Sequence, residues 1–304
     1  MKLKSKFLLF FFLLFFLQIS ASRIMYVDNF MNILGSYTNE TKLFEFCKEN
    51  KINSIILYDL NKVNKVYKLS DKKQNGILAK FISKAKTEYG INQIAASGET
   101  SKFFIDAIVP YNNSRKSSNE KFDIFNIEYE YWNLESNKED GYYCQTYLKQ
   151  NKIPCTREGT FSYFMKSLKE MKSLANKSKH KVKVGVYVAN YNEKEINEIE
   201  KYADRISVYD YTTYPDNLFH YIKERSDLLV NYKSKADIYI LFSSEMNFIG
   251  KYLSNHSLDD IEKLFKKELL SEEPGLENKI NLKGFTYYNY GYLENSFKHH
   301  FNKK

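Results

Sequence analysis

Three polar side chains alternate with apolar ones in the stretch 122–132, which reads FDIFNIEYEYW. Asn126, Glu128 and Glu130 are spaced two residues apart, and a β-strand places residues with that spacing on one face. Burying an unpaired carboxylate is costly, so an inward position indicates either a hydrogen-bond network or chemistry. Two neighbouring carboxylates also disfavour each other's ionisation, which suits a general acid near neutral pH. We therefore interpret the stretch as a candidate catalytic strand.

The rest of the sequence predicts the scaffold that positions these residues. Runs rich in β-forming residues recur eight times and alternate with amphipathic stretches, a pattern typical of a closed parallel (β/α)8 barrel. An open doubly wound sheet is the alternative, but no glycine-rich phosphate-binding loop follows the first run. We predict a single barrel domain over residues 23–304, with its site at the carboxyl ends of the strands. The expected strands are 24–30, 54–60, 91–97, 122–132, 182–189, 205–212, 237–243 and 284–291, and the helix candidates include 40–50, 77–89, 160–176, 193–203 and 258–270.

The first 22 residues have the composition of a secretory signal peptide. Three lysines precede an unbroken apolar run over residues 7–17, and the small residues Ser20, Ala21 and Ser22 follow. The run of 11 apolar residues is short for a membrane span, which needs about 20. We expect cleavage near Ser22–Arg23, no stable membrane span afterwards, and a secreted, periplasmic or endomembrane-lumen location.

The cysteines predict a disulfide rather than a metal site. Cys144 and Cys155 lie close together in a loop-like segment, whereas Cys47 falls in a helix-like stretch and suits a buried thiol. In an oxidising compartment we expect Cys144 and Cys155 to pair and to pin the 133–160 loop as a lid. The three cysteines lack CxxC spacing and the five histidines lack HExxH spacing, so we expect no metal and no organic cofactor.

The charge of the chain is basic but dispersed. Removing residues 1–22 takes away three of the 46 Lys and Arg residues, and the remaining 43 against 37 Asp and Glu give a net charge of +6. The lysines are scattered along helix-like stretches with acids between some of them, which argues against a nucleic-acid patch. Attraction to an anionic polysaccharide or envelope surface remains open.

Two segments together resemble family 18 glycoside hydrolases, the family of chitinases and endo-β-N-acetylglucosaminidases. The spacing Asp123-x-x-Asn126-x-Glu128-x-Glu130 is similar to that family's D-x-x-D-x-D-x-E signature on the fourth strand. The segment 207–211, SVYDY, resembles the M-x-Y-D segment of the sixth strand. On the third strand, ASGE at 96–99 keeps only the first glycine of the family's S-x-G-G. The predicted eight-strand layout matches the whole catalytic barrel of the family.

The resemblance implies a substrate-assisted, retaining mechanism without metal or cofactor. Glu130 would protonate the glycosidic oxygen while the acetamido group of the sugar attacks the anomeric carbon. Glu128 would orient that acetamido group, and Tyr209 would hydrogen-bond its carbonyl oxygen. Asp210 would contact the sugar or the acid. This scheme differs from the usual pair of nucleophilic and acidic carboxylates.

The glycan itself would meet a wider set of residues. For substrate binding we expect Asp123 and Asn126 from the motif, Trp132 as a stacking platform, and Tyr287 or Tyr288 at the eighth strand, where the family usually has a Trp. Trp132 could equally be a core residue at the barrel rim. The substrate would contain N-acetylglucosamine, and chitin, peptidoglycan and N-linked glycans all qualify.

Two departures from the motif keep a second function open. Asn126 and Glu128 stand where the family has Asp, so a charge is lost at one position and a side chain is longer at the other. The alternative to a glycosidase is therefore a catalytically inactive, lectin-like barrel that binds such a glycan. The retained Glu130 favours the enzyme.

Overall fold

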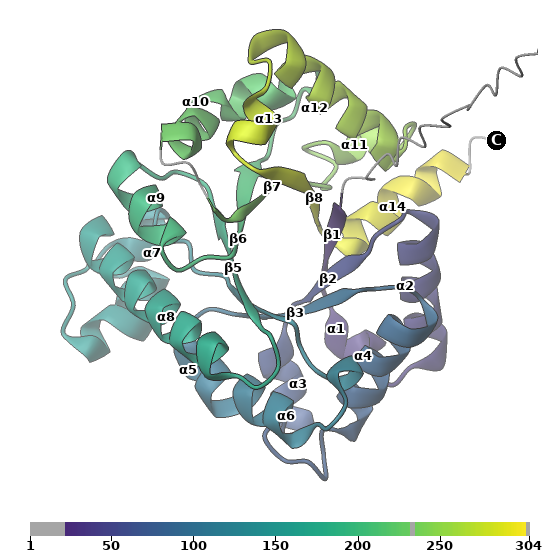
Figure 1. Ribbon diagram of the computed structural model, residues 1–304, viewed down its shortest axis with the longest axis vertical. Helices are drawn as coiled ribbons and strands as arrows, with labels where there is room; N and C mark the ends of the chain where they lie inside the picture. The colour runs from purple at the N-terminus through teal and green to yellow at the C-terminus, as the bar shows by residue number, and fades with distance from the viewer. Residues whose placement is uncertain (1–21, 232–234, 302–304) are drawn as a thin grey trace, which may run out of the picture.

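The computed structural model describes residues 22–231 and 235–301 as a closed barrel of eight parallel strands. The predicted signal peptide, residues 1–22, lies outside the described residues except for Ser22, which begins the first strand. The strands pair in sequence order and β1 pairs with β8, so the sheet closes on itself (Figure 1). The (β/α)8 prediction is confirmed. The strands are β1 Ser22–Val27, β2 Ser54–Leu57, β3 Gln93–Gly98, β4 Ile124–Ile127, β5 Lys183–Val188, β6 Arg205–Asp210, β7 Asp237–Ser243 and β8 Leu282–Tyr288.

Helices surround the ring of strands and cover its outer face (Figure 1). Side-chain caps fix the starts of several: Thr156 accepts from the Gly159 backbone N–H at 3.1 Å, and reciprocal capping boxes begin the helices after Asn192 and Ser257. Within the described residues, no helix is both long and apolar enough to cross a membrane. The α-helices are α1 Phe30–Ile33, α2 Tyr37–Glu49, α3 Leu60–Val66, α4 Gly76–Glu88, α5 Ser101–Phe103, α6 Val109–Ser114, α7 Leu134–Asn137, α8 Arg157–Lys177, α9 Glu193–Glu200, α10 Leu218–Asn231, α11 Gly250–Leu253, α12 Leu258–Glu272, α13 Leu276–Lys279 and α14 Tyr290–Phe301.

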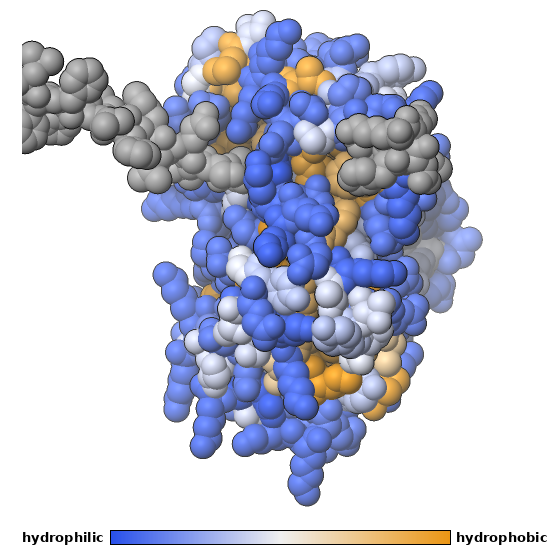
Figure 2. Space-filling model, turned by 90° about the vertical axis from the view of Figure 1, so that its right-hand side faces the viewer, coloured by the Kyte–Doolittle hydropathy of each residue, from blue (hydrophilic) through white to orange (hydrophobic). Residues whose placement is uncertain are grey.

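The outer face of these helices is solvated. Hydrophilic side chains cover most of the face shown in Figure 2, and apolar side chains show mainly in gaps between them. This arrangement follows from the amphipathic pattern of the helices, which turn one stripe to the sheet and the other to water.

Strand alternation decides which side chains fill the barrel. On β6, Arg205 contacts Gln93 and the ring of Tyr239 near the amino ends of the strands. One layer higher, the hydroxyls of Ser207 and Thr286 lie 3.3 Å apart. The next residues of the same parity reach the carboxyl ends, so polar side chains line the interior up to the mouth.

Strand β4 is shorter than its sequence pattern predicts. Regular pairing ends at Ile127, although the Glu128 backbone N–H still donates to the Gly98 carbonyl at 3.0 Å. The chain then turns, with the Tyr131 N–H donating to the Tyr129 carbonyl at 3.0 Å. Both tyrosines are buried against aromatic residues of α8, so their strand-like alternation reflects packing beyond the strand end.

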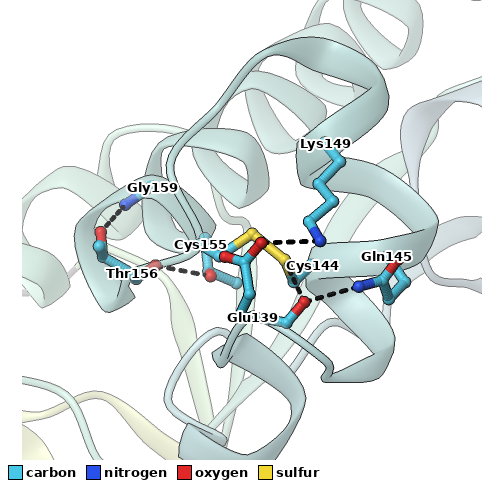
Figure 3. The surroundings of a disulfide bond; sticks show 8 residues. Glu139, Cys144, Gln145, Lys149, Cys155, Thr156 and Gly159 are labelled. Carbon is cyan, nitrogen blue, oxygen red and sulfur yellow. Dashed lines mark hydrogen bonds and ion pairs between the residues drawn. A yellow bond between two sulfur atoms is a disulfide. The ribbon is translucent and has the colours of Figure 1, made fainter.

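The segment between β4 and α8 contains the predicted disulfide. Cys144 and Cys155 are bonded, with their Cα atoms 5.2 Å apart (Figure 3). Beside them, Lys149 pairs with the Glu139 carboxylate at 2.8 Å, and Gln145 donates to the Glu139 carbonyl at 2.6 Å (Figure 3). Cys47 is a buried free thiol, as expected. The disulfide therefore ties the base of this segment to the start of α8.

Candidate active site

The amide and carboxylate predicted to share one face do meet at the mouth of the barrel. Glu128 Oε1 accepts hydrogen bonds from the Tyr26 phenol at 2.6 Å and from the Asn126 side-chain amide. Asn126 is 3% exposed and Tyr26 is 2% exposed, so this group lies at the bottom of the mouth. The predicted network is present, with a tyrosine from β1 as an additional member.

A glycine on the neighbouring strand makes room for Asn126. The β4–β5 register places Gly185 opposite Asn126, and a Cβ on Gly185 would lie 2.7 Å from Asn126 Oδ1. Any larger residue would push the amide away from Glu128. The position of the amide thus depends on two adjacent strands.

Burial changes the protonation of Glu128. It raises the pKa of the carboxyl group from 4.5 to about 8, and the negative charge of Glu130 adds to the shift. Hydrogen bonds from Tyr26 and Asn126 act in the opposite direction without offsetting it. Glu128 is therefore mainly neutral at pH 7, and its Oε2 atom forms no hydrogen bond with the described residues.

Glu130 is held by three contacts from different parts of the chain. The phenol of Tyr187 on β5 donates to Oε1, and the Asn133 amide donates to Oε2 at 3.0 Å. Its backbone N–H donates to the phenol oxygen of Tyr143 at 3.0 Å, which links it to the disulfide-containing segment. These contacts give the carboxylate a fixed orientation.

Tyrosines from β6 and β8 complete the wall of the mouth. The Tyr209 ring stacks on Tyr211 at 3.9 Å, and Tyr288 packs edge-on against Tyr26 at 5.7 Å. Burial raises the pKa of Tyr209 to about 12, with a smaller contribution from the charge of Glu130. Tyr209 and Tyr288 are half-buried, and a tyrosine side chain carries both apolar ring surface and a hydroxyl group.

Three residues expected in the site lie elsewhere, for reasons of strand geometry. Asp123 precedes β4 at its amino end, opposite the mouth, where it pairs with Lys86 at 2.7 Å and contacts His180 at 3.2 Å. Its other role is structural, since it accepts from the Ile94 backbone N–H at 2.9 Å. Asp123 is thus placed away from any substrate bound at the mouth.

Asp210 and Tyr287 have the opposite strand parity to Tyr209 and Tyr288. Asp210 is fully buried, burial raises its pKa well above the ordinary range, and its nearest charges belong to Arg225 on α10 and Glu268 on α12. Tyr287 is also fully buried and donates to Glu262 of α12 at 2.8 Å. Both side chains therefore belong to the interface between barrel and helices, and neither reaches the mouth.

Trp132 serves packing rather than stacking on a ligand. It is 9% exposed and lies edge-on to Tyr187 at 5.2 Å and to Tyr131 at 5.0 Å. Its low exposure fits a core residue at the barrel rim better than a platform on which a sugar stacks. Through Tyr187, its indole helps to position the phenol that contacts Glu130.

The sequence interpretation missed Tyr26, Tyr187 and Glu99. Each lies at or near the carboxyl end of a predicted strand, on the same parity as other inward residues, so strand alternation was the available signal. Glu99 follows β3 and accepts hydrogen bonds from the phenols of Tyr142 and Tyr147. The disulfide-containing segment thus reaches the mouth and closes one side of it, as a lid would.

Comparison with known proteins identifies no family for this chain. No family model matches the sequence, and no curated protein matches it. A chitinase structure from Ipomoea carnea has 14% identity over 92% of this chain and 98% of its own, with a TM-score of 0.49. A family 18 chitinase from Crocus vernus has 12% identity over 93% and 97%, with a TM-score of 0.48. A 3-deoxy-D-arabino-heptulosonate 7-phosphate synthase from Thermotoga maritima has 10% identity over 88% and 74%, with a TM-score of 0.41. These likenesses concern the fold alone.

Proposed function

We propose that the protein is a secreted retaining glycosidase that cleaves glycans containing N-acetylglucosamine. The observation that carries the proposal is the convergence of Glu130, Glu128 and Tyr209 on one barrel mouth, with Glu130 oriented by Tyr187. Two interior carboxyl groups in different environments are what separate acid and stabilising roles require. The Cys144–Cys155 disulfide supports an oxidising compartment.

The proposed reaction begins with the sugar that occupies the mouth. Its acetamido oxygen attacks the anomeric carbon, the glycosidic C–O bond breaks, and Glu130 gives its proton to the departing oxygen. Tyr209 donates a hydrogen bond to the acetamido oxygen, and the free oxygen of Glu128 accepts one from the acetamido N–H. The reacting form is the one in which the single proton of the pair lies on Glu130 and Glu128 is ionised, and the positive charge that develops on the oxazolinium ring stabilises ionised Glu128. Water then attacks the anomeric carbon and returns a proton to Glu130.

Hydrolysis of aryl chitooligosaccharides and of a high-mannose glycoprotein tests the proposal. Native protein should release product, and Glu130→Gln should lower the rate by about 10²–10⁴-fold because one positioned acid is lost. Glu135→Gln is the matched control, since Glu135 is exposed on α7 and, among the residues that the structure describes, forms an ion pair with Lys138 alone; its rate should stay near that of the native protein.

The same assay separates the alternatives. Turnover that is undiminished in Glu130→Gln would refute the mechanism. Tight glycan binding without turnover in either form would identify a lectin-like barrel instead of an enzyme.

A further inference from the structure

A small acidic cavity adjoins the mouth on the side of β2 and β3. It has a volume of about 230 Å³, below the ~300–1,000 Å³ typical of sites for drug-sized ligands, which suits one sugar unit. Its carboxyl groups are Asp59, Glu99 and Glu128, and its rings include Tyr58 and Tyr147. Because Glu128 also belongs to the mouth, a glycan in the mouth could extend into this cavity.

Each of the three carboxyl groups keeps one oxygen available. Asp59 uses Oδ2 for Lys62 at 2.9 Å, and the Lys62 side chain is mostly exposed. Glu99 uses Oε2 for the two lid phenols, and Glu128 uses Oε1 for Tyr26 and Asn126. The remaining oxygens, Asp59 Oδ1, Glu99 Oε1 and Glu128 Oε2, have no hydrogen bond or ion pair with the described residues.

The side chain of Ser97, a buried residue of β3, also lines the cavity. Ser97 is 5% exposed, and its register opposite Asn126 places it on the inner face of β3. Its hydroxyl forms no hydrogen bond with the part of the chain that the structure describes, and Ser97 lines the cavity. The hydroxyl oxygen itself is open to the cavity, so it is available to a polar ligand there.

The lining fits an organic cation better than a metal ion. A metal draws its ligand oxygens to within about 2.0–2.6 Å of itself. Among the described residues, the single group close enough for that is Glu139 with the two disulfide-bonded cysteines, not the three cavity carboxyl groups. Carboxylates spread around aromatic rings and a hydroxyl match an ammonium group carried on a sugar ring, which also offers hydroxyls.

We propose that this cavity binds the free ammonium group of a de-N-acetylated amino sugar, next to the N-acetylated unit in the mouth. The inference rests on the proposed function, because it assigns the neighbouring unit of the same glycan. It makes partially de-N-acetylated chains the preferred substrate class. Glu99 and Asp59 supply the negative charge, and Ser97 accepts or donates a hydrogen bond to the sugar.

Calorimetric titration with two matched tetrasaccharides tests the cavity. One tetrasaccharide is fully N-acetylated. The other is partially de-N-acetylated and carries free amines next to an N-acetylated unit. Both are titrated into Glu130→Gln at about pH 6, below the ordinary pKa of an amine. The amine-bearing ligand should bind at least about tenfold more tightly. Adding Glu99→Gln or Asp59→Asn should each remove most of that preference, while affinity for the N-acetylated ligand changes less than about twofold.

Two variants keep the outcome interpretable. Glu135→Gln in the same background should retain the preference. Asp59→Asn is needed because Glu99→Gln also removes an acceptor from the lid phenols, whereas the ion pair of Asp59 is with Lys62 and not with the lid. Equal affinity for both ligands, or a preference that survives both substitutions, overturns the cavity assignment. Amine-dependent binding in a protein that hydrolyses no glycan would instead overturn the proposed enzyme and leave the cavity standing.

Discussion

Glu128 and Glu130 are two residues apart, yet their surroundings differ. Glu128 lies deeper and receives its hydrogen bonds on one oxygen, whereas Glu130 is contacted on both oxygens. Charge repulsion between neighbouring carboxylates was foreseeable from their spacing. The extent to which burial raises the pKa of Glu128 was not foreseeable, because burial depends on how the strands close around the mouth.

The pKa of Glu128 predicts how stability depends on pH. Its folded-state pKa of about 8 lies above the ordinary 4.5, so between these values the folded protein holds a proton that the unfolded chain releases. Rising pH therefore costs stability across that interval, by up to about 5 kcal/mol at 1.36 kcal/mol per pKa unit. Glu128→Gln, which mimics the neutral acid, should lack this loss.

Urea unfolding of both proteins at about pH 5 and pH 9 measures the effect. The free energy of unfolding of the native protein should fall relative to Glu128→Gln as pH rises, because other titrating groups cancel in the comparison. A difference that stays constant with pH would show that Glu128 is ionised in the folded state at neutral pH.

At the scale of the element, strand parity explains which site residues were foreseeable. The prediction that Asn126, Glu128 and Glu130 share one face was correct, even though regular strand pairing stops at Ile127. For the pairs Tyr209–Asp210 and Tyr287–Tyr288, adjacent residues cannot both face inward, and the apolar composition of β6 and β8 does not reveal the parity. The neighbouring Ser207–Thr286 contact settles it in the structure.

The disulfide-containing segment carries the second prediction. Cys144 and Cys155 are 11 residues apart, and closing a loop of that size stabilises a protein by about 3 kcal/mol in the chain-entropy model. The double variant Cys144→Ser with Cys155→Ser should lose about that much in urea unfolding. The loss should extend to the lid, so glycan affinity should fall as well.

A reducing agent provides the control for this prediction. It should destabilise the native protein to the level of the double variant and leave the double variant unchanged, since Cys47 is already a buried thiol. If the double variant unfolds at the native urea concentration, the segment is held by its noncovalent contacts, among them the phenols that bond to Glu99 and to the Glu130 backbone.

At the scale of the whole molecule, all eight predicted runs became strands of one barrel, because each run is long, β-rich and flanked by helix patterns. The bounds of several helices, among them α3, α10 and α14, were not predicted. Helix α14 begins at Tyr290, inside the run 284–291, where tyrosines favour a strand locally. Its packing against α2, through Phe46 with Tyr290 and Phe297, determines its helical state and is not visible in local sequence.

The seam between β1 and β8 has a consequence for the order of events during synthesis. Arg23 pairs with Phe285, so the sheet keeps an open edge at the first strand until the last strand has been made. A nascent chain lacking β8 exposes two unpaired strand edges, which favour aggregation. A chain stopped after Asn281 should therefore be protease-sensitive and prone to aggregate, whereas one stopped after Phe301 should unfold cooperatively. A protease-resistant monomer from the shorter chain would mean that the first seven strands form a stable sheet by themselves.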